Sequence, residues 1–350
     1  MQNKTTALGI MSGSSLDGLD FCIVDFDKIE EQWNYKISYC KTIEIPEKLK
    51  TQLARSPELD SINLQELDRK YGHWIGEGII SLNHSFDLIA IHGHTVFHAP
   101  EKGQSLQIGS GQVISHMTGV PTITNFRNLD IQLGGQGAPL VPMGEKSLFP
   151  EFDGFLNLGG ICNGSFNSKN SWSAGDIGPF NQVLNFFSRK AGLAFDDGGL
   201  LASTGKLNQS ILSDWNTFDF FRLHFPKSLG NDWVKEHFLN DFDCPPADVL
   251  YTFSTFISEK IAQAMNRHQP QRVLTTGGGA YNTYLVDQIR SQTDSEIEIP
   301  NKQLVEFKEA LIFAFLGLLK MRNESNVLSS CTGASRDSCS GDIYSGEQNV

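Results

Sequence analysis

The stretch "GIMSGSSLDGLDFCIVDFD", residues 9–27, decides the fold: two apolar, strand-like runs flank a polar turn. The turn from Ser12 to Gly18 holds three serines, two glycines and one carboxylate, more than a plain hairpin needs. Glycines let a ligand approach the backbone, successive N–H groups can cradle a phosphate, and a carboxylate can orient a metal ion. A polar surface hairpin is the alternative, and this stretch alone leaves it open.

The length and net charge of the chain limit its number of domains and the kinds of partner it can bind. The 350 residues are enough for two domains. With 28 Lys plus Arg against 40 Asp plus Glu, the net charge is −12. Such a chain has no electrostatic attraction for nucleic acid or an anionic membrane, so we expect neither as a partner. A small anionic ligand is still compatible with this charge.

The cysteines and the apolar segments of the chain indicate the cellular compartment in which we expect the protein. Six cysteines form no C-x-x-C pair, so we interpret them as reduced thiols rather than a disulfide framework or zinc site. The start of the sequence has no apolar segment of signal-peptide length. The most apolar window, residues 310–319, is about half the length that spans a bilayer and predicts a buried helix. We therefore expect a cytoplasmic protein.

Strands alternate with helices along the chain, which predicts an α/β fold with mixed sheets. Apolar and β-branched patterns predict strands near residues 6–11, 19–26, 34–44, 87–91, 105–108, 121–125, 153–158 and 272–276. Helical periodicity predicts helices near 62–83, 180–191, 247–267, 281–292 and 304–321. A glycine-rich joint follows a strand in each half, "MSGSSLDG" and "NLGGICNG", which suits two similar lobes.

Two segments carry side chains suited to a polar ligand. In "IHGHTVFH", residues 91–98, His92 and His94 would share a strand face, but without a nearby carboxylate they make a poor zinc site. Donors lining a pocket for a hydroxylated ligand are the better interpretation. In "NFRNLDIQLGGQGAP", residues 125–139, Arg127 could grip a carboxylate with its planar fork, or form a surface pair with Asp130.

Two further segments join strands to helices. In "SAGDIGPFNQVLN", residues 173–185, Asp176 precedes a Gly-Pro turn, and we expect Pro179 in the first helical turn. Asp176 is then either a capping side chain or a general base. In "TTGGGAYN", residues 275–282, three glycines at such a joint predict a flat ligand lying against the backbone. The standard nucleotide motifs are absent, because "GLLASTGKL" lacks the P-loop spacing.

Together these segments resemble the anhydro-N-acetylmuramic acid kinase family of actin-like, hexokinase-like and Hsp70-like ATPases. The matching motifs run in the family's order from about residue 8 to 342, and include "HGHTVFHAP", "QIGSG", "GDIGPFN", "PKSLG", "TGGGAYN" and "KEALIFAFLG". The resemblance implies a two-lobed actin-like ATPase (ribonuclease H-like) fold with mixed central sheets and an ATP cleft between the lobes. We expect one lobe of residues 1–128 plus about 329–350, and a second of residues 129–328.

The resemblance also assigns residues to ligands, with ATP and Mg²⁺ as cofactors. Asp17 would orient Mg²⁺ through water, and the sugar would contact Arg127 (at its lactyl carboxylate), Glu309, His94 and Thr95. ATP would contact Gly13, Ser14, Ser15, Leu16, Asp17, Gly18, Leu19 and Asp20, the turn at Gly159 and Gly160, and Gly277, Gly278, Gly279, Ala280 and Asn282.

The implied reaction opens the anhydro ring of 1,6-anhydro-N-acetylmuramic acid with water and phosphorylates its 6-oxygen in cell-wall recycling. Asp176 would activate the water, and the protein would be a homodimer. The chain departs from the family pattern at Ser14, Ile177, Phe180 and Tyr281, where Thr, Thr, Gly and His are usual. Two alternatives stay open: a kinase of another amino sugar with the same fold, and a non-catalytic sugar or nucleotide sensor.

Overall fold

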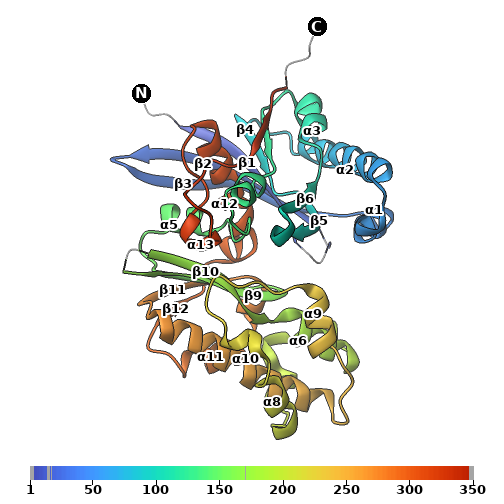
Figure 1. Ribbon diagram of the computed structural model, residues 1–350, viewed down its shortest axis with the longest axis vertical. Helices are drawn as coiled ribbons and strands as arrows, with labels where there is room; N and C mark the ends of the chain where they lie inside the picture. The colour runs from blue at the N-terminus through green and yellow to red at the C-terminus, as the bar shows by residue number, and fades with distance from the viewer. Residues whose placement is uncertain (1–3, 14–15, 17, 170, 347–350) are drawn as a thin grey trace. The chain divides into compact units, whose positions relative to one another are not determined.

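Each half of the chain builds its own mixed β-sheet with helices packed beside it (Figure 1). The computed structural model describes residues 4–13, 16, 18–169 and 171–346, so Ser14, Ser15 and Asp17 lie outside the described residues. The chain divides into a first unit, Met1–Pro150 with Phe307–Val350, and a second unit, Glu151–Glu306. The expected α/β class with mixed sheets is confirmed.

The unit boundaries differ from the expected ones at 128/129 and 328/329. Residues 129–150 and most of helix α12 (Lys302–Met321) pack with the first unit. A buried ion pair accounts for part of this assignment, because Lys308 on α12 contacts Glu145 on α5 (Pro142–Leu148). The glycine- and proline-rich segment 133–146 therefore lies inside the first unit.

The sheet of the first unit has the strand order β13-β7-β4-β1-β2-β3. Its strands are β1 (Thr5–Ser12), β2 (Gly18–Ile29), β3 (Gln32–Glu44), β4 (Leu88–Ile91), β7 (Thr122–Thr124) and β13 (Asp342–Tyr344). A separate hairpin joins β5 (His94–Ala99) to β6 (Gln104–Ile108). The remaining helices of this unit are α1 (Glu47–Ala54), α2 (Ser61–Ser81), α3 (Gly111–Thr118), α4 (Asn128–Gln132) and α13 (Ser329–Thr332).

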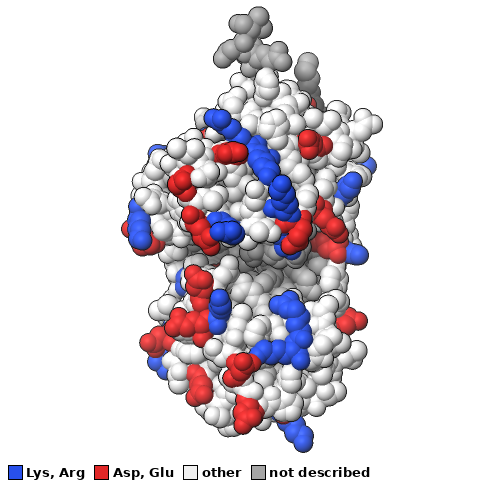
Figure 2. All heavy atoms as spheres, turned by 90° about the vertical axis from the view of Figure 1, so that its right-hand side faces the viewer, with Lys and Arg blue, Asp and Glu red and all other residues white. Residues whose placement is uncertain are grey.

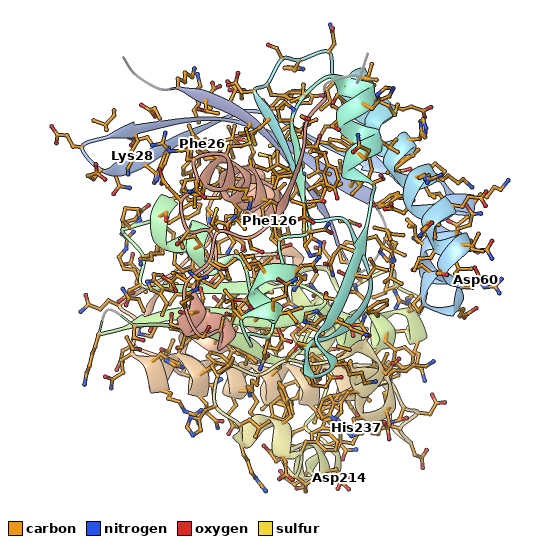
Figure 3. All side chains as sticks on the ribbon, turned by 45° about the horizontal axis from the view of Figure 1, so that its top comes forward. Phe26, Lys28, Asp60, Phe126, Asp214 and His237 are labelled. Carbon is orange, nitrogen blue, oxygen red and sulfur yellow. The ribbon has the colours of Figure 1, made fainter. Side chains whose placement is uncertain are left out.

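Helix α12 forms the aromatic core on one face of this sheet. Phe26 of β2 packs on Phe315 with ring centroids 5.6 Å apart, and Phe126 packs on Phe313 at 5.5 Å (Figure 3). Residues 310–319 are all buried, which confirms the predicted buried helix. Among the described residues, no helix is both long and apolar enough to cross a bilayer.

The sheet of the second unit has the order β10-β9-β8-β11-β12. Its strands are β8 (Gly154–Leu158), β9 (Ile161–Ser168), β10 (Ser171–Pro179), β11 (Arg272–Thr276) and β12 (Glu296–Glu298). Its helices are α6 (Asn181–Lys190), α7 (Leu200–Ser203), α8 (Gln209–Trp215), α9 (Asn231–Phe238), α10 (Pro246–His268) and α11 (Thr283–Arg290). An aromatic cluster around Trp215, Phe238, Phe253 and Phe256 fills the core.

The two sheets share a five-stranded arrangement. In each, three antiparallel strands form a meander, a fourth strand pairs in parallel with the first strand of that meander, and a fifth pairs in parallel with the fourth. The first sheet adds β13, which is antiparallel to β7. The first strand is β1 in one unit and β8 in the other, and each leads into one of the glycine-rich turns. This agrees with the expected pair of similar lobes.

The ion pair between Lys308 and Glu145 generates a stability prediction. The two groups are 2.6 Å apart with side chains only 2% and 5% exposed. Lys308→Met leaves the buried carboxylate without its cation, and we expect denaturant unfolding to show a loss of about 3–5 kcal/mol. The double variant with Glu145→Met should recover much of this loss.

Lys302→Met is the matched control on the same helix. Its partner Glu306 lies 3.7 Å away, and the two side chains are 78% and 40% exposed. We expect a change within about 0.5 kcal/mol for this pair. Equal effects of the Lys302 and Lys308 variants would contradict the assignment.

Candidate active site

Asp176 lies in edge strand β10, not at a helix cap. The strand continues to Pro179, and Phe180, which precedes α6, makes no side-chain cap. The expectation of Pro179 in the first helical turn is therefore wrong. A β-bulge between Asp176 and Gly178 interrupts the regular pairing with β9 beside the carboxylate, and the pairing resumes at Gly178.

A segment from another part of the second unit holds the Asp176 carboxylate. The Leu229 N–H donates to Oδ2 at 2.7 Å and the Ser228 hydroxyl donates to the same oxygen at 3.3 Å. The Asp176 N–H donates to the Lys227 carbonyl at 2.9 Å. We call residues 225–229 the clamp segment.

Gly175 is needed for this close approach. A Cβ at this position would lie 2.7 Å from the Phe225 ring and 2.9 Å from the Lys227 carbonyl oxygen. Any side chain there would push the clamp segment off the strand edge.

Although the clamp segment donates to this carboxylate, the pKa of Asp176 is close to neutral pH. Burial raises the pKa of Asp176 to about 6, while the Leu229 N–H, Ser228 and Lys227 act to lower it. Within the described part of the chain, no group donates a hydrogen bond to Oδ1. A carboxylate with one oxygen fixed, the other without a donor, and a pKa near the working pH has the properties of a general base.

The two departures beside Asp176 point into the core. Ile177 is 2% exposed and Phe180 is fully buried, both in the cluster beneath the sheet. Phe180 lies against Gly279, where an added Cβ would come within 2.3 Å of its ring. These side chains therefore fill the interior of the second unit.

The turn at Gly159 and Gly160 joins β8 to β9 and receives the start of α6. The Asn181 N–H donates to the Gly159 carbonyl at 3.1 Å, and the N–H groups of Phe180 and Gln182 donate to the Gly160 carbonyl at 2.9 and 3.2 Å. These three donors at the start of α6 are thus engaged with the turn itself.

The three glycines after β11 differ in their surroundings. Gly277 has φ +83°, and a Cβ there would lie 2.4 Å from the Asn157 side chain; Gly279 is equally crowded. Gly278 has only an Asn181 atom at 3.9 Å and so presents open backbone. Ala280 is buried, and the Asn282 side chain caps α11 through the Leu285 N–H at 3.1 Å.

The described part of the first turn is tight and joins β1 to β2. The Leu16 N–H donates to the Gly13 carbonyl at 3.3 Å, and Leu16 is buried with φ +56°. Gly18 and Leu19 begin β2, and Asp20 accepts a hydrogen bond from the Thr42 hydroxyl at 2.6 Å.

Arg127 is organised by a histidine that the sequence did not associate with it. Its Nε and Nη2 approach the His92 Nε2 at 3.3 and 2.8 Å, and its Nη1 donates to the Gly137 carbonyl at 2.8 Å. His92 Nδ1 lies 2.9 Å from the Gly93 carbonyl, so it carries the proton and Nε2 accepts from Arg127. Burial and the Arg127 charge lower the pKa of His92 to about 3, so the imidazole is neutral.

Glu309 lies in the same electrostatic neighbourhood as Arg127 and Asp20. Burial raises the pKa of Glu309; Lys308 and Arg127 lower it, and Glu145 and Asp20 raise it. Burial also lowers the pKa of Arg127 to about 10, and Glu309 opposes this shift. The first unit therefore brings together Asp20, Arg127 and Glu309, which are far apart in the sequence.

The two histidines of "IHGHTVFH" do not share a face, because Gly93 adopts φ +80° between them. His94 Nε2 lies 3.1 Å from the Leu53 carbonyl and 3.3 Å from the Ser56 hydroxyl, so it faces α1. The Thr95 hydroxyl accepts a weak bond from Gln107 at 3.4 Å. Over the described ranges, no group of three or more His, Cys, Asp or Glu side chains could hold a metal ion.

Comparison with known proteins decides the family. The family described as anhydro-N-acetylmuramic acid kinase matches residues 5–346. The anhydro-N-acetylmuramic acid kinase of Shewanella denitrificans is 33% identical over 97% of this chain and 98% of its own. The Hydrogenovibrio crunogenus kinase is 31% identical over 96% and 97%. This chain belongs to the anhydro-N-acetylmuramic acid kinase family.

Solved structures with similar architecture are more distant. A glucokinase of the ROK family from Streptomyces griseus, in complex with glucose and AMPPNP, aligns with TM-score 0.45 and 13% identity over 89% of this chain and 98% of that chain. The activator of the 2-hydroxyisocaproyl-CoA dehydratase from Clostridium difficile, with bound ADPNP, aligns with TM-score 0.44 and 12% identity over 91% and 97%.

Sequence reasoning missed the residues that position the candidate site. "PKSLG" was part of the family resemblance, but nothing in it indicated that Ser228 and Leu229 would reach Asp176, 52 and 53 residues away. His92 was considered only as a ligand or pocket donor, not as the acceptor that orients Arg127. The contact of Ser228 and Leu229 with Asp176 does have a signal in the sequence, because a glycine directly before a carboxylate in a strand indicates close approach of another backbone segment.

Removing the Ser228 hydroxyl tests the clamp. Ser228→Ala deletes one hydrogen bond to the ionised carboxylate, so the pKa of Asp176 should rise from about 6. We expect the acid limb of the kcat profile to move up by about half to one pH unit. Ser203→Ala removes a hydroxyl that donates to the Leu200 carbonyl at 2.7 Å, and it should leave the acid limb unchanged. A downward shift in Ser228→Ala would contradict the assignment.

Proposed function

We propose that this family member is a cytoplasmic enzyme that uses ATP to convert 1,6-anhydro-N-acetylmuramic acid to N-acetylmuramate 6-phosphate during cell-wall recycling. The match across residues 5–346 is the observation that carries the proposal. A homodimer is part of the same proposal and follows from the family alone.

The reaction needs one base and one phosphoryl transfer. Water attacks the anomeric carbon while the bond from that carbon to the bridging 6-oxygen breaks. The 6-oxygen forms a bond to the γ-phosphorus, and the bond from that phosphorus to the β,γ-bridging oxygen breaks to release ADP. The water's proton passes to the base, so atoms and charge balance.

Asp176 is the proposed base. Its Oδ2 is fixed by the clamp segment at 2.7 and 3.3 Å, which leaves Oδ1 to take the proton. With a pKa near 6, the carboxylate is mostly ionised at pH 7 and more basic than an ordinary aspartate. The clamp segment, all of whose residues the structure describes, positions the carboxylate through Oδ2 and makes no hydrogen bond to Oδ1.

Arg127 is the proposed partner of the lactyl carboxylate. The neutral His92 and the Gly137 carbonyl take part of its five N–H groups and fix the plane of the guanidinium. The remaining N–H groups can donate to a planar anion. Glu309 lies close enough for each group to affect the other's pKa, and we assign it to a sugar hydroxyl. His94 and Thr95 are weaker candidates, since both already contact protein groups.

ATP is assigned to the glycine-rich joints: the turns at Gly13 and Gly159–Gly160, and the joint at Gly278, which presents open backbone. Mg²⁺ fits this donor set, because Mg²⁺ bound to phosphates needs only one or two protein carboxylates. Asp17 is the candidate, and Asp20 is the first carboxylate of β2 after the turn. When bound, Mg²⁺ would neutralise phosphate charge during transfer.

The substrate is tested directly with purified protein, ATP and Mg²⁺. Phosphate transfer to 1,6-anhydro-N-acetylmuramic acid should exceed transfer to N-acetylmuramic acid or N-acetylglucosamine by orders of magnitude in kcat/KM. Faster transfer to an ordinary amino sugar would favour the second kinase hypothesis. Nucleotide binding without any turnover would favour the sensor.

Asp176→Asn tests the base. The amide keeps the size of the side chain but cannot accept a proton, so kcat should fall by about 10²–10⁴-fold. The dissociation constant of ATP, measured by calorimetry, should change less than about twofold. Retention of more than about a tenth of the wild-type kcat would remove Asp176 from the role of base.

Arg127→Lys tests the carboxylate contact. The variant keeps a positive charge but loses the planar fork, so KM for the anhydro sugar should rise by about 10–100-fold with a smaller change in kcat. The matched control is Arg189→Lys on the exposed end of α6. A fall of about 10–100-fold in the kcat of Arg127→Lys with an unchanged KM would contradict the binding role.

A further inference from the structure

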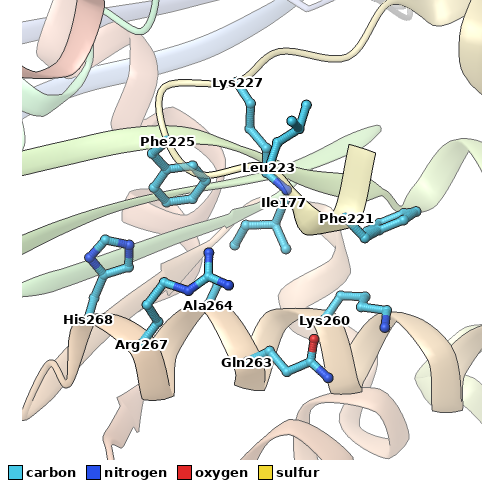
Figure 4. A pocket seen from close by; sticks show the side chains of 10 residues that line it. All are labelled: Ile177, Phe221, Leu223, Phe225, Lys227, Lys260, Gln263, Ala264, Arg267 and His268. Carbon is cyan, nitrogen blue, oxygen red and sulfur yellow. The ribbon is translucent and has the colours of Figure 1, made fainter. Parts of the chain in front are cut away.

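A polar pocket lies in the second unit, behind the strand that carries Asp176. It is bounded by α10 below and by the chain from 3₁₀ helix η4 (Asp219–Arg222) into the clamp segment above (Figure 4). Its lining includes Phe221, Phe225, Lys227, Lys260 and Arg267. The cavity is about 30 Å³, room for two or three water molecules at ~10–15 Å³ each. This size suits a small ion.

Three cations gather around this cavity without an ion pair. Lys227 donates to the Phe220 carbonyl at 3.1 Å, Lys260 donates to the Asn216 amide oxygen at 2.7 Å, and Arg267 contacts a ring nitrogen of His224 at 3.3 Å. Over the part of the chain that the structure describes, none of them lies within 4.0 Å of a carboxylate oxygen.

This gathering is unusual for an acidic chain of net charge −12. The face shown in Figure 2 carries both Lys and Arg and Asp and Glu side chains. At the pocket, the carboxylates that act on the cations are already engaged: Asp176 with the clamp segment and Glu259 with the Gln263 amide at 2.7 Å. Asp176 and Glu259 therefore offset only part of the positive charge of the three cations.

The cations also disturb one another. Burial, together with the charges of Arg267 and Lys260, lowers the pKa of Lys227 to about 8, and the charge of Asp176 opposes this shift. The Lys227 ammonium lies 4.1 Å from the centre of the Phe220 ring and the Lys260 ammonium lies 5.2 Å from that of Phe256. Aromatic walls reduce solvent screening, so an anion between these groups would be attracted more strongly than at an open surface.

His268 completes one wall without adding charge. Its ring stacks on Phe166 at 5.0 Å and on Phe225 at 5.5 Å. Burial lowers its pKa, and Arg267 and His224 lower it further, so the ring is neutral at pH 7. It and the Gln263 amide can supply neutral hydrogen bonds beside the three cations.

We propose that this pocket, lined by Lys227, Lys260 and Arg267, is a binding site for a small phosphate group, either inorganic phosphate or a phosphate monoester. A tetrahedral dianion fits the volume, the charge and the arrangement of donors. The site is separate from Asp176 and is not part of the proposed reaction.

The clamp segment links this pocket to Asp176. Lys227 accepts the Asp176 N–H through its backbone carbonyl and sends its side chain into the pocket. Ser228 and Leu229, the next residues, hold the Asp176 carboxylate. An anion bound to Lys227 and to α10 would therefore restrain the segment that fixes this carboxylate.

Calorimetry on the whole protein tests binding. Inorganic phosphate is titrated into enzyme whose nucleotide site is filled with a non-hydrolysable ATP analogue, and sodium chloride at equal ionic strength is the blank. We expect saturable binding, and at least about tenfold weaker binding in Lys260→Gln/Arg267→Gln. N-acetylglucosamine 6-phosphate in a second titration distinguishes a monoester from free phosphate.

Arg189→Gln/Lys235→Gln is the matched control, because it removes the same two charges from exposed positions on α6 and α9. Its affinity for phosphate should stay within about twofold of the wild type. Gln263→Glu, which places a carboxylate at the pocket with little change of shape, should weaken binding as much as the double variant.

Hydrogen exchange supplies a local measurement that does not depend on turnover. Saturating phosphate should slow amide exchange in residues 219–230 of the wild type and not of Lys260→Gln/Arg267→Gln. Absence of saturable binding up to about 20 mM phosphate, or equal weakening in the control pair, would overturn the proposal. Binding without protection of residues 219–230 would place the anion elsewhere and overturn it as well.

Discussion

A carboxylate that is withdrawn from water must be held by donors, and the arrangement around Asp176 follows from that constraint. The clamp segment satisfies Oδ2 with the Leu229 N–H at 2.7 Å and the Ser228 hydroxyl at 3.3 Å. Burial nevertheless dominates and keeps the pKa near 6. The bulge in the edge strand and the glycine at position 175 allow the clamp segment to approach this one side chain closely.

In the first unit, buried charged groups are held by partners of opposite charge. Lys308 Nζ on α12 lies 2.6 Å from Glu145 Oε1, and the next residue on that helix is Glu309. Arg127 is held independently by the neutral His92, and the charges of Arg127 and Glu309 affect each other's pKa. Side chains that are already fixed in this way lose little conformational entropy when they bind a polar ligand.

The fold was largely predictable, because long periodic segments such as α2, α10 and α12 and the strands β1 and β2 have clear apolar patterns. The strand β10 was not, because glycine and proline in "SAGDIGP" indicate a turn, although an edge strand tolerates both. The family motifs identified Asp176 and Arg127 as candidates. Their positioning by Leu229 and His92 could not be predicted, since these contacts depend on how distant segments fold together.

The central claim is that water opens the anhydro ring as the 6-oxygen takes the phosphoryl group. One reaction in ¹⁸O-labelled water with ATP, Mg²⁺ and 1,6-anhydro-N-acetylmuramic acid, quenched early and analysed by mass spectrometry, tests it most directly. Early quenching matters because the free anomeric hydroxyl exchanges slowly with solvent. The account predicts a sugar phosphate with one heavy oxygen at the anomeric carbon and none in the phosphate. An unlabelled sugar phosphate, or heavy oxygen only in released phosphate, would contradict it.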